Sequence, residues 1–276
     1  MNQALLTKMK GIFLHPLFLV FITPLTYILI GSIYAAQLSS IAFLPFIGLY
    51  LFILVNQLLE KIITIWLQKL NKELTTSLLI TEAINLLIIS YFALSFHLLI
   101  GLLLLFYSIL IQGQVYFVEI GLKWFTFIMK AIFKGGILTY ISFFIQLPFI
   151  PNTIFLWSIP LTLLALLVEI TEYSVKTKQV EQIKKNRFLF LSLLVLLYLS
   201  SFLILSLSFS FFSLFLLLSL PAAWNMLSLY RVSSHTKSSS IKLKQLMVFS
   251  VIFLLSFALI ISTKSFFGSI IFSVGE

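Results

Sequence analysis

The first group of residues that could do chemistry is a short amide and carboxylate cluster, Asn56-Gln57-x-x-Glu60. Asn56 and Glu60 are four residues apart, so they share one face of a helix, and Gln57 lies on the adjacent face. Oxygen atoms of this kind are the ligands that Mg²⁺ prefers, and magnesium sites in proteins leave positions for substrate phosphates. The alternative is structural: Asn56 would bond a neighbouring helix, and Glu60 would be a solvated helix end.

The second group begins at Glu169 and Glu172 and continues to Lys176 and Lys178. Glu169, Glu172 and Lys176 fall at positions i, i+3 and i+7, which again places them on one helix face. Two carboxylates facing the helix that bears Glu60 could hold Mg²⁺. The structural alternative is a helix end laced by Glu–Lys pairs, and the spacing alone leaves both interpretations open.

The elements that must position these residues are membrane helices. Hydrophobic residues make up 61% of the 276 residues and charged residues only 9%, far below the charge that covers a soluble protein. About 20 apolar residues are needed for one crossing of a bilayer. Nine segments meet this description, although the fifth is weak because Phe117–Phe133 carries lysines and could lie in the membrane interface. The nine are Leu17–Ala36, Ile41–Leu59, Leu78–Phe96, Leu98–Ile111, Ile132–Leu147, Phe155–Val168, Phe188–Leu205, Phe209–Leu227 and Leu246–Ser262.

The distribution of positive charge predicts the orientation of these helices. Seventeen of the eighteen lysine and arginine residues fall before the first span or in alternate connections, and only Lys264 falls on the other side. Because positive residues collect on the cytoplasmic side, we expect a cytoplasmic N-terminus and an outside C-terminus. The fold class is therefore an all-α integral membrane protein, with residues 1–276 forming one bundle of about nine transmembrane helices. The net charge of +10 indicates contact with anionic lipid and no nucleic-acid partner.

The remaining polar residues inside the apolar spans are few. Tyr107 and Tyr140 are polar positions that either bond neighbouring helices or line a polar cavity. The chain has no Cys, which excludes thiol chemistry and cysteine-based zinc sites, and it has no Asp, so every acidic residue is Glu. Neither a Walker A motif nor a dinucleotide-binding fingerprint is present.

Taken in order, these motifs resemble those of the UbiA superfamily of membrane prenyltransferases. The resemblance extends over most of the chain. One polar motif falls between the second and third spans, and the other falls between the sixth and seventh. The matching segments are His15-Pro16, Thr23-Pro24, Asn56-Gln57-x-x-Glu60, Thr81-Glu82-Ala83, Phe106-Tyr107-Ser108, Gly135 and Glu169-x-x-x-Tyr173.

The resemblance implies transfer of an isoprenyl group from a prenyl diphosphate to an acceptor, which is an aromatic or quinone-precursor ring. It implies that Mg²⁺ is held by Glu60, Glu169 and Glu172 and assists departure of the diphosphate. It also implies a set of residues that bind the substrate. These are Asn56, Gln57, Lys72, Tyr107, Tyr140, Lys176 and Lys178. The composition, rich in Phe, Ile, Leu and Lys and poor in Arg, is typical of an AT-rich bacterial genome, so we expect a bacterial cell membrane as the location.

The departure from the family pattern is the replacement of its Asp ligands. Gln57 and Glu60 stand in the first motif and Glu169 and Glu172 in the second, where relatives have Asp. This departure leads to one alternative, a catalytically degenerate relative that binds isoprenoid lipid or assists a membrane protein partner. A separate alternative is a permease subunit of unrelated fold.

Overall fold

The computed structural model describes residues 15–69, 72–176, 187–231 and 239–273, and every regular element in them is a helix. Eight of these helices are long and apolar enough to span a membrane. The elements are α2 (Pro16–Ala36), α3 (Phe43–Lys69), α4 (Lys72–Ser95), α5 (Leu98–Glu119), α6 (Lys123–Ala131), η1 (Ile132–Ile137), α7 (Leu138–Phe144), α8 (Asn152–Lys176), α10 (Arg187–Phe209), η2 (Ser210–Ser219), α11 (Leu220–Arg231) and α12 (Ser239–Ser273).

The ninth predicted span is a shorter apolar helix, Phe211–Leu227, which runs from η2 into α11. The element η2 is a 3₁₀-helix of 10 residues. Because a 3₁₀-helix rises about 2.0 Å per residue instead of about 1.5 Å, η2 covers more distance for its length than an α-helix would. The all-α, multi-pass fold with about nine helices is confirmed over the described residues.

The fifth span differs from its prediction. It comprises α6, η1 and α7 in one apolar stretch, Lys123–Phe144, and so begins nine residues before the expected Ile132. That the stretch Phe117–Phe133 lies in the membrane interface stays a prediction, and what differs is the start of the apolar helix. Lys130 turns inward and is buried among polar partners from neighbouring helices, so its charge does not keep the segment out of the bundle.

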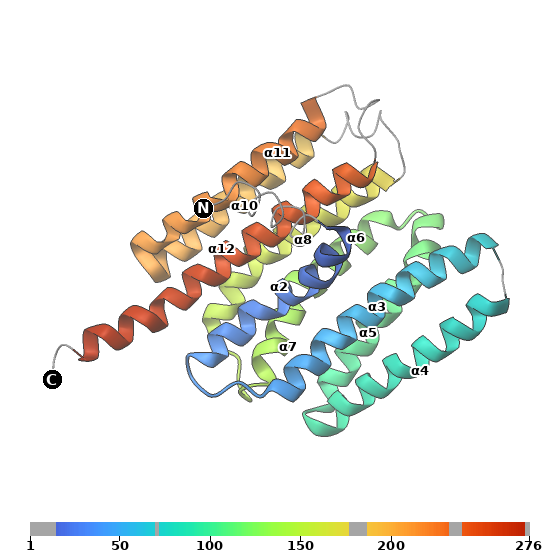
Figure 1. The fold of residues 1–276 in the computed structure, drawn as a ribbon, viewed down its shortest axis with the longest axis horizontal. Helices are drawn as coiled ribbons and strands as arrows, with labels where there is room; N and C mark the ends of the chain where they lie inside the picture. Colours follow the sequence, from blue (N-terminus) through green and yellow to red (C-terminus); the bar gives the residue numbers. More distant parts are fainter. Residues whose placement is uncertain (1–14, 70–71, 177–186, 232–238, 274–276) are drawn as a thin grey trace, which may run out of the picture.

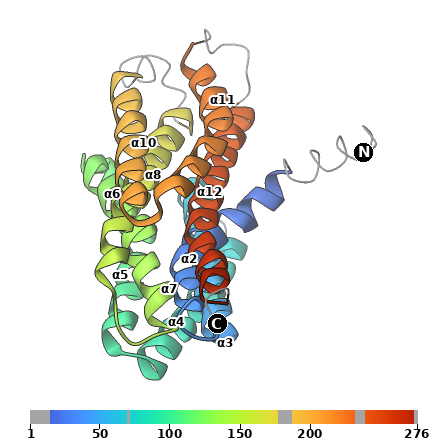
Figure 2. The same cartoon turned by 90° about the vertical axis from the view of Figure 1, so that its left-hand side faces the viewer.

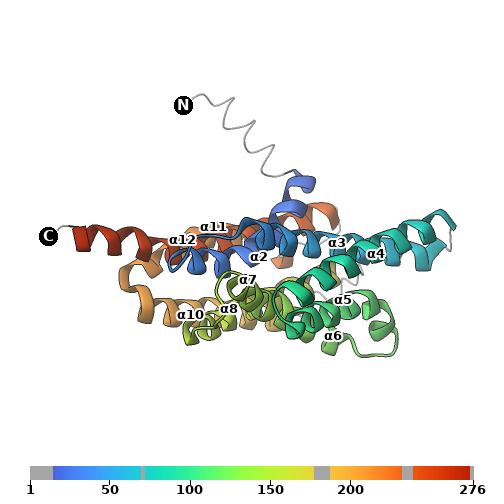
Figure 3. The same cartoon turned by 90° about the horizontal axis from the view of Figure 1, so that it is seen from below.

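The helices run roughly side by side and form two layers (Figures 1, 2 and 3). In Figure 3, α12, α2 and α3 lie in one layer, and α10, α8 and α6 lie in the other. Contacts of α2 with α7 and of α12 with α8 join the layers. At the edge of the bundle α4 packs against α3 and α5 and leaves most of its surface exposed, as expected for a helix that faces lipid.

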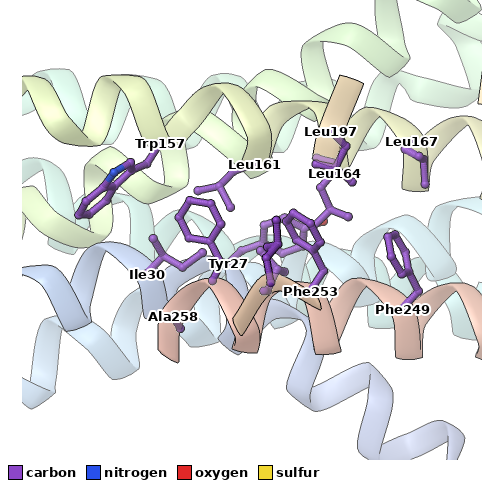
Figure 4. Packing of buried hydrophobic residues seen from close by; sticks show 14 of the residues in the cluster. Tyr27, Ile30, Trp157, Leu161, Leu164, Leu167, Leu197, Phe249, Phe253 and Ala258 are labelled. Atoms are coloured by element: carbon purple, nitrogen blue, oxygen red, sulfur yellow. The ribbon is translucent and has the colours of Figure 1, made fainter. Parts of the chain in front are cut away.

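The apolar core consists of two clusters. The larger one joins α2, α8, α10 and α12, and Figure 4 shows its side chains meeting between these helices. The smaller one joins α3, α4, α5 and the fifth span, and includes Phe52, Tyr107 and Phe133. The polar cluster described below involves α3, α5, α8 and the fifth span, and so draws on helices of both groups.

Two glycines allow close approach between the fifth span and its neighbours. A Cβ atom on Gly135 would overlap the backbone of Leu161 and Thr162 in α8. A Cβ atom on Gly31 would overlap Thr139 and Ser142 of α7. The fifth span is therefore packed backbone to backbone against α8 on one side and α2 on the other, which fixes the position of the lysines that it carries.

Candidate functional site

The centre of the site is Lys130, whose ammonium group has three oxygen partners from three other helices. Its Nζ lies 2.9 Å from Glu169 Oε2 on α8 and 3.5 Å from Glu60 Oε1 on α3. It also donates a hydrogen bond of 2.9 Å to Gln114 Oε1 on α5. The contact with Glu60 is an ion pair longer than a normal hydrogen bond, whereas those with Glu169 and Gln114 have hydrogen-bond length.

A second lysine completes the cluster one turn further along the fifth span. Lys134 Nζ lies 2.5 Å from Glu169 Oε1, so the two oxygens of Glu169 each bind a different lysine. Gln114 Nε2 in turn donates a bond of 2.8 Å to Glu60 Oε1. Two ammonium groups and two carboxylates are thus joined by direct contacts, and their formal charges cancel.

Burial makes this cluster energetically important. The side chains of Lys130 and Glu169 are 5% and 6% exposed, whereas those of Lys134 and Glu60 are 19% and 21% exposed. Charges removed from water are tolerated in proteins when they are paired, and ionisable groups inside a membrane mark candidate functional sites. The open side of the cluster is therefore the side of Lys134 and Glu60.

The cluster lies below one end of the bundle. Lys130 is seven residues after the start of its apolar span, Glu60 seven before the end of its own, and Glu169 six before the end of its own. At about 1.5 Å per residue these positions are about 10 Å inside the spans. The end concerned is the one that the positive charges predict to be cytoplasmic.

Local backbone structure supports the placement of Lys134. It belongs to η1, a π-helical segment of six residues that interrupts the fifth span and also contains Gly135 and Gly136. Single π-turns inside α-helices are found frequently at functional sites. The extra residue of such a turn changes the direction in which the side chains around it point.

A second polar network lies one turn away on α3. Asn56 Nδ2 donates to Asn85 Oδ1 at 3.0 Å, and Asn85 Nδ2 donates to Ser108 Oγ at 2.7 Å. Gln112 Nε2 donates to Ser108 Oγ at 3.0 Å and to Glu82 Oε2 at 2.7 Å, which adds a second link between α5 and α4. Asn56 Oδ1 is buried and has no hydrogen-bond partner among the described residues. The amide nitrogen of Asn56 therefore makes the bond between helices that the structural interpretation expects, whereas its amide oxygen does not.

The predicted site residues meet only in part. Glu60 and Glu169 are 109 positions apart in the sequence, and both carboxylates contact the ammonium of Lys130. Glu172 lies one turn beyond Glu169 on α8 and is half-buried. Gln57 is half-buried on the neighbouring face of α3. The remaining predicted lysines cannot be placed: the side chains of Lys72 and Lys176 and the whole of Lys178 lie outside the described residues.

The two predicted tyrosines have different environments. Tyr107 is buried with its ring 5.8 Å from that of Phe52 and 5.7 Å from that of Phe133, which precedes Lys134. Tyr140 lies further along the fifth span, where its hydroxyl is 2.9 Å from Ser158 Oγ on α8. Tyr107 is therefore a neighbour of the cluster, and Tyr140 joins two helices.

The sequence pattern does not single out Lys130, Lys134 or Gln114 as site residues. Charge disfavours a membrane span, so the pattern assigns the two lysines to a cytoplasmic connection. The feature that could have indicated them is their spacing of four residues, which places both lysines on one helix face in a segment that becomes strongly apolar at Ile132. Gln114 offers no comparable signal.

The oxygen donors around Lys130 are of a type that Mg²⁺ accepts. Among the described residues, no three His, Cys, Asp or Glu side chains form a group that could hold a metal ion. Two carboxylates and one amide oxygen do surround a single cation, the ammonium of Lys130. All three oxygens bind that ammonium in this structure, so the described donor set holds a lysine and does not fit a metal ion in the same place.

Comparison of the chain with protein-family models, with curated proteins and with solved structures finds no match. The resemblance to membrane prenyltransferases thus stays a prediction based on the sequence motifs.

Proposed function

We propose that this protein is a membrane prenyltransferase-like enzyme that transfers an isoprenyl group from a prenyl diphosphate to an acceptor, in a bacterial cell membrane. The observation that supports it is the shared cation position. The motifs selected Glu60 and Glu169 as ligands from distant parts of the sequence, and both carboxylates contact Lys130 Nζ. A structural helix end would require no such meeting of the two motifs.

The residues of the cluster have distinct roles in this proposal. Lys130 and Lys134 bind the phosphate oxygens and neutralise the charge that develops on the departing diphosphate. Glu60, Glu169 and Gln114 hold these lysines in place, and Mg²⁺ bound to the incoming diphosphate would supply further neutralisation of that charge. The aromatic rings of Tyr107, Phe52 and Phe133 pack on one another and belong to α5, α3 and the fifth span, which also carry cluster residues, and ring faces of this kind can stabilise a cationic allyl group.

The reaction is a substitution at the allylic carbon. The bond from this carbon to the diphosphate oxygen breaks, and the diphosphate keeps the electron pair. A nucleophilic carbon of an aromatic or quinone-precursor acceptor forms the new bond and releases its proton to solvent. The isoprenoid tail lies among apolar side chains in the bilayer.

The test uses purified protein in lipid nanodiscs with Mg²⁺, a radiolabelled prenyl diphosphate and a panel of aromatic acceptors. We expect labelled product and released diphosphate, and a fall in rate of about 100-fold or more in Glu169→Gln. Glu119→Gln, at an exposed acidic residue at the end of α5, is the matched control and should retain activity. Absence of both binding and turnover in the unmodified protein would refute the proposal.

One observation favours a second function, that of a catalytically degenerate relative which binds isoprenoid lipid or assists a membrane protein partner. The four charges of the cluster cancel without any ligand, so they could serve only to hold α3, α8 and the fifth span together. Binding of a prenyl alcohol that is equal in Mg²⁺ and in chelator, without turnover of any prenyl diphosphate, would favour this function over the first.

A further inference from the structure

The second polar network contains a carboxylate that has no positive partner. Glu82 is eight residues after the start of the apolar span of α4, which corresponds to a depth of about 12 Å. Its Oε2 accepts a hydrogen bond of 2.7 Å from Gln112 Nε2, and its Oε1 accepts a long one of 3.5 Å from Asn85 Nδ2. Both donors are neutral amides. No described lysine, arginine or histidine forms an ion pair with Glu82, in contrast to Glu60 and Glu169.

The amides around this carboxylate have no further donors to offer. Asn56 gives its two N–H groups to a backbone carbonyl of its own helix and to Asn85 Oδ1. Asn85 and Gln112 each divide theirs between Glu82 and Ser108 Oγ. A side-chain amide has only two N–H groups, so all six are engaged. The network therefore meets the charge of Glu82 with dipoles alone.

The same network has oxygen acceptors in excess. Asn56 is only 1% exposed, and its Oδ1 has no hydrogen-bond partner among the described residues. Glu82 Oε1 accepts only the long bond from Asn85, although a carboxylate oxygen can accept two. Buried oxygens normally have partners, so an excess of acceptors beside a carboxylate favours a positively charged ligand.

The charge of the site indicates a monovalent cation. An ionised side chain inside a membrane span is costly unless it is neutralised, and residues of this kind mark ion and proton sites. Among the described residues, no three His, Cys, Asp or Glu side chains form a group for a metal ion, so a divalent cation would lack carboxylates here. One positive charge neutralises Glu82, and both Na⁺ and a proton supply one.

The titratable groups on the neighbouring helices do not neutralise Glu82. The helices that pack against α4 are α3 and α5. On α3, Glu60 belongs to the lysine cluster, and Lys61 is exposed and forms no ion pair. On α5, Glu119 is exposed at the end of the helix. The other titratable side chains described on α3, α4 and α5 are Tyr50, Tyr91, Tyr107 and Tyr116.

We propose that Glu82 and the amide network around it form a site for an exchangeable monovalent cation, Na⁺ or a proton, between α3, α4 and α5. The inference does not rest on the proposed function, because Glu82 makes no contact with the lysine cluster that carries that function. The hydrogen bonds of the site connect α4 with both of its neighbours, so the cation also neutralises the joint that holds this outer helix in the bundle.

The test is chemical labelling of carboxyl groups in the full chain in lipid nanodiscs, with peptide mass spectrometry as the readout. Dicyclohexylcarbodiimide is soluble in lipid and adds to a protonated carboxyl group. A water-soluble carbodiimide with glycine methyl ester labels carboxyl groups that face water. Both reactions are followed from mildly acidic to mildly basic pH, in choline chloride and with Na⁺ replacing choline at constant ionic strength.

We expect dicyclohexylcarbodiimide to modify Glu82, and the rate to fall as the pH rises because only the protonated group reacts. Where Na⁺ binds, about ten times its dissociation constant should slow this reaction by about tenfold, since only the free fraction of the site reacts. A rate that Na⁺ does not change identifies the proton alone as the ligand. Glu82→Gln should remove the label.

The control carboxylates lie in the same chain. Glu60 and Glu169 contact lysines and should stay unmodified by the lipid-soluble reagent. Glu119 is exposed and should react with the water-soluble one.

Two results would overturn the inference. One is labelling of Glu82 by the water-soluble reagent as fast as that of Glu119, because water would then neutralise the carboxylate. The other is no modification of Glu82 by dicyclohexylcarbodiimide at acidic pH. Both are measured on the unmodified protein, so they hold even if Glu82→Gln does not fold. Neither result depends on prenyl diphosphate, so failure of the inference and failure of the proposed function are separate outcomes.

Discussion

Glu169 should contribute more to the stability of the bundle than any other single charged residue of the cluster. Its carboxylate lies 2.9 Å from Lys130 and 2.5 Å from Lys134, and its side chain is only 6% exposed. At an effective dielectric constant of about 20, a contact near 2.9 Å is worth roughly 6 kcal/mol before the cost of desolvation is subtracted. Glu169→Gln keeps the shape of the side chain and removes the charge that both lysines share.

Loss of one partner from a buried ion pair typically costs about 3–5 kcal/mol, because the other charge is left uncompensated. We therefore expect Glu169→Gln to lower the free energy of unfolding by about 3–5 kcal/mol. Glu60 is 21% exposed and its contact with Lys130 is 3.5 Å, so Glu60→Gln should cost only about 1 kcal/mol or slightly more.

The assay is unfolding by dodecyl sulfate in mixed micelles, followed by tryptophan fluorescence. Glu119→Gln should change the free energy of unfolding by about 0.5 kcal/mol or less, as expected for an exposed residue. The double variant Glu169→Gln with Lys134→Met should cost less than the sum of its single variants by about 0.5–3 kcal/mol. Additive effects, or equal costs for Glu169→Gln and Glu60→Gln, would contradict the pairing scheme.

Three further predictions concern packing, the second polar network and orientation. Gly135→Ala should destabilise the protein by about 1–3 kcal/mol in the same assay, because its Cβ would overlap the backbone of α8. The control is Gly136→Ala, which should be close to neutral because the nearest atom to its Cβ would be 3.6 Å away. Asn85→Leu should cost about 1–3 kcal/mol because it removes the bonds that Asn85 makes to α3 and α5. The chain has no Cys, so Lys61→Cys and Ser40→Cys introduce single thiols towards opposite ends of α3, and an impermeant reagent applied outside cells should label only Ser40→Cys.

Much of the fold could be predicted because apolar spans are long and water is excluded from the bilayer. The low charge of the chain, together with runs of about 20 apolar residues, predicts helices and their approximate number. The exception is the fifth span. Counting a lysine as unfavourable inside the membrane assumes that it is unpaired, and Lys130 has three partners that come from other helices.

The site could be predicted less completely, because spacing relates motif residues only within their own helices. It places Asn56 and Glu60 on one face of α3, which agrees with their burial. It could not reveal that a lysine from the fifth span stands between Glu60 and Glu169, since that depends on how closely the fifth span packs against α8. Gly135 controls this approach, and nothing in its local sequence names α8 as its neighbour.

The cluster gives a physical reason for the use of Glu instead of Asp at positions 60 and 169. Glu60 and Glu169 belong to α3 and α8, and the ammonium of a third segment, α6, lies between their carboxylates. A glutamate carries its carboxylate one methylene further from the backbone than an aspartate does, which helps two helices to reach one ammonium group. Asp at either position would draw the carboxylate back towards its own helix and weaken its contact with Lys130. The use of Glu in place of Asp is thus consistent with two helices that are joined through one buried lysine.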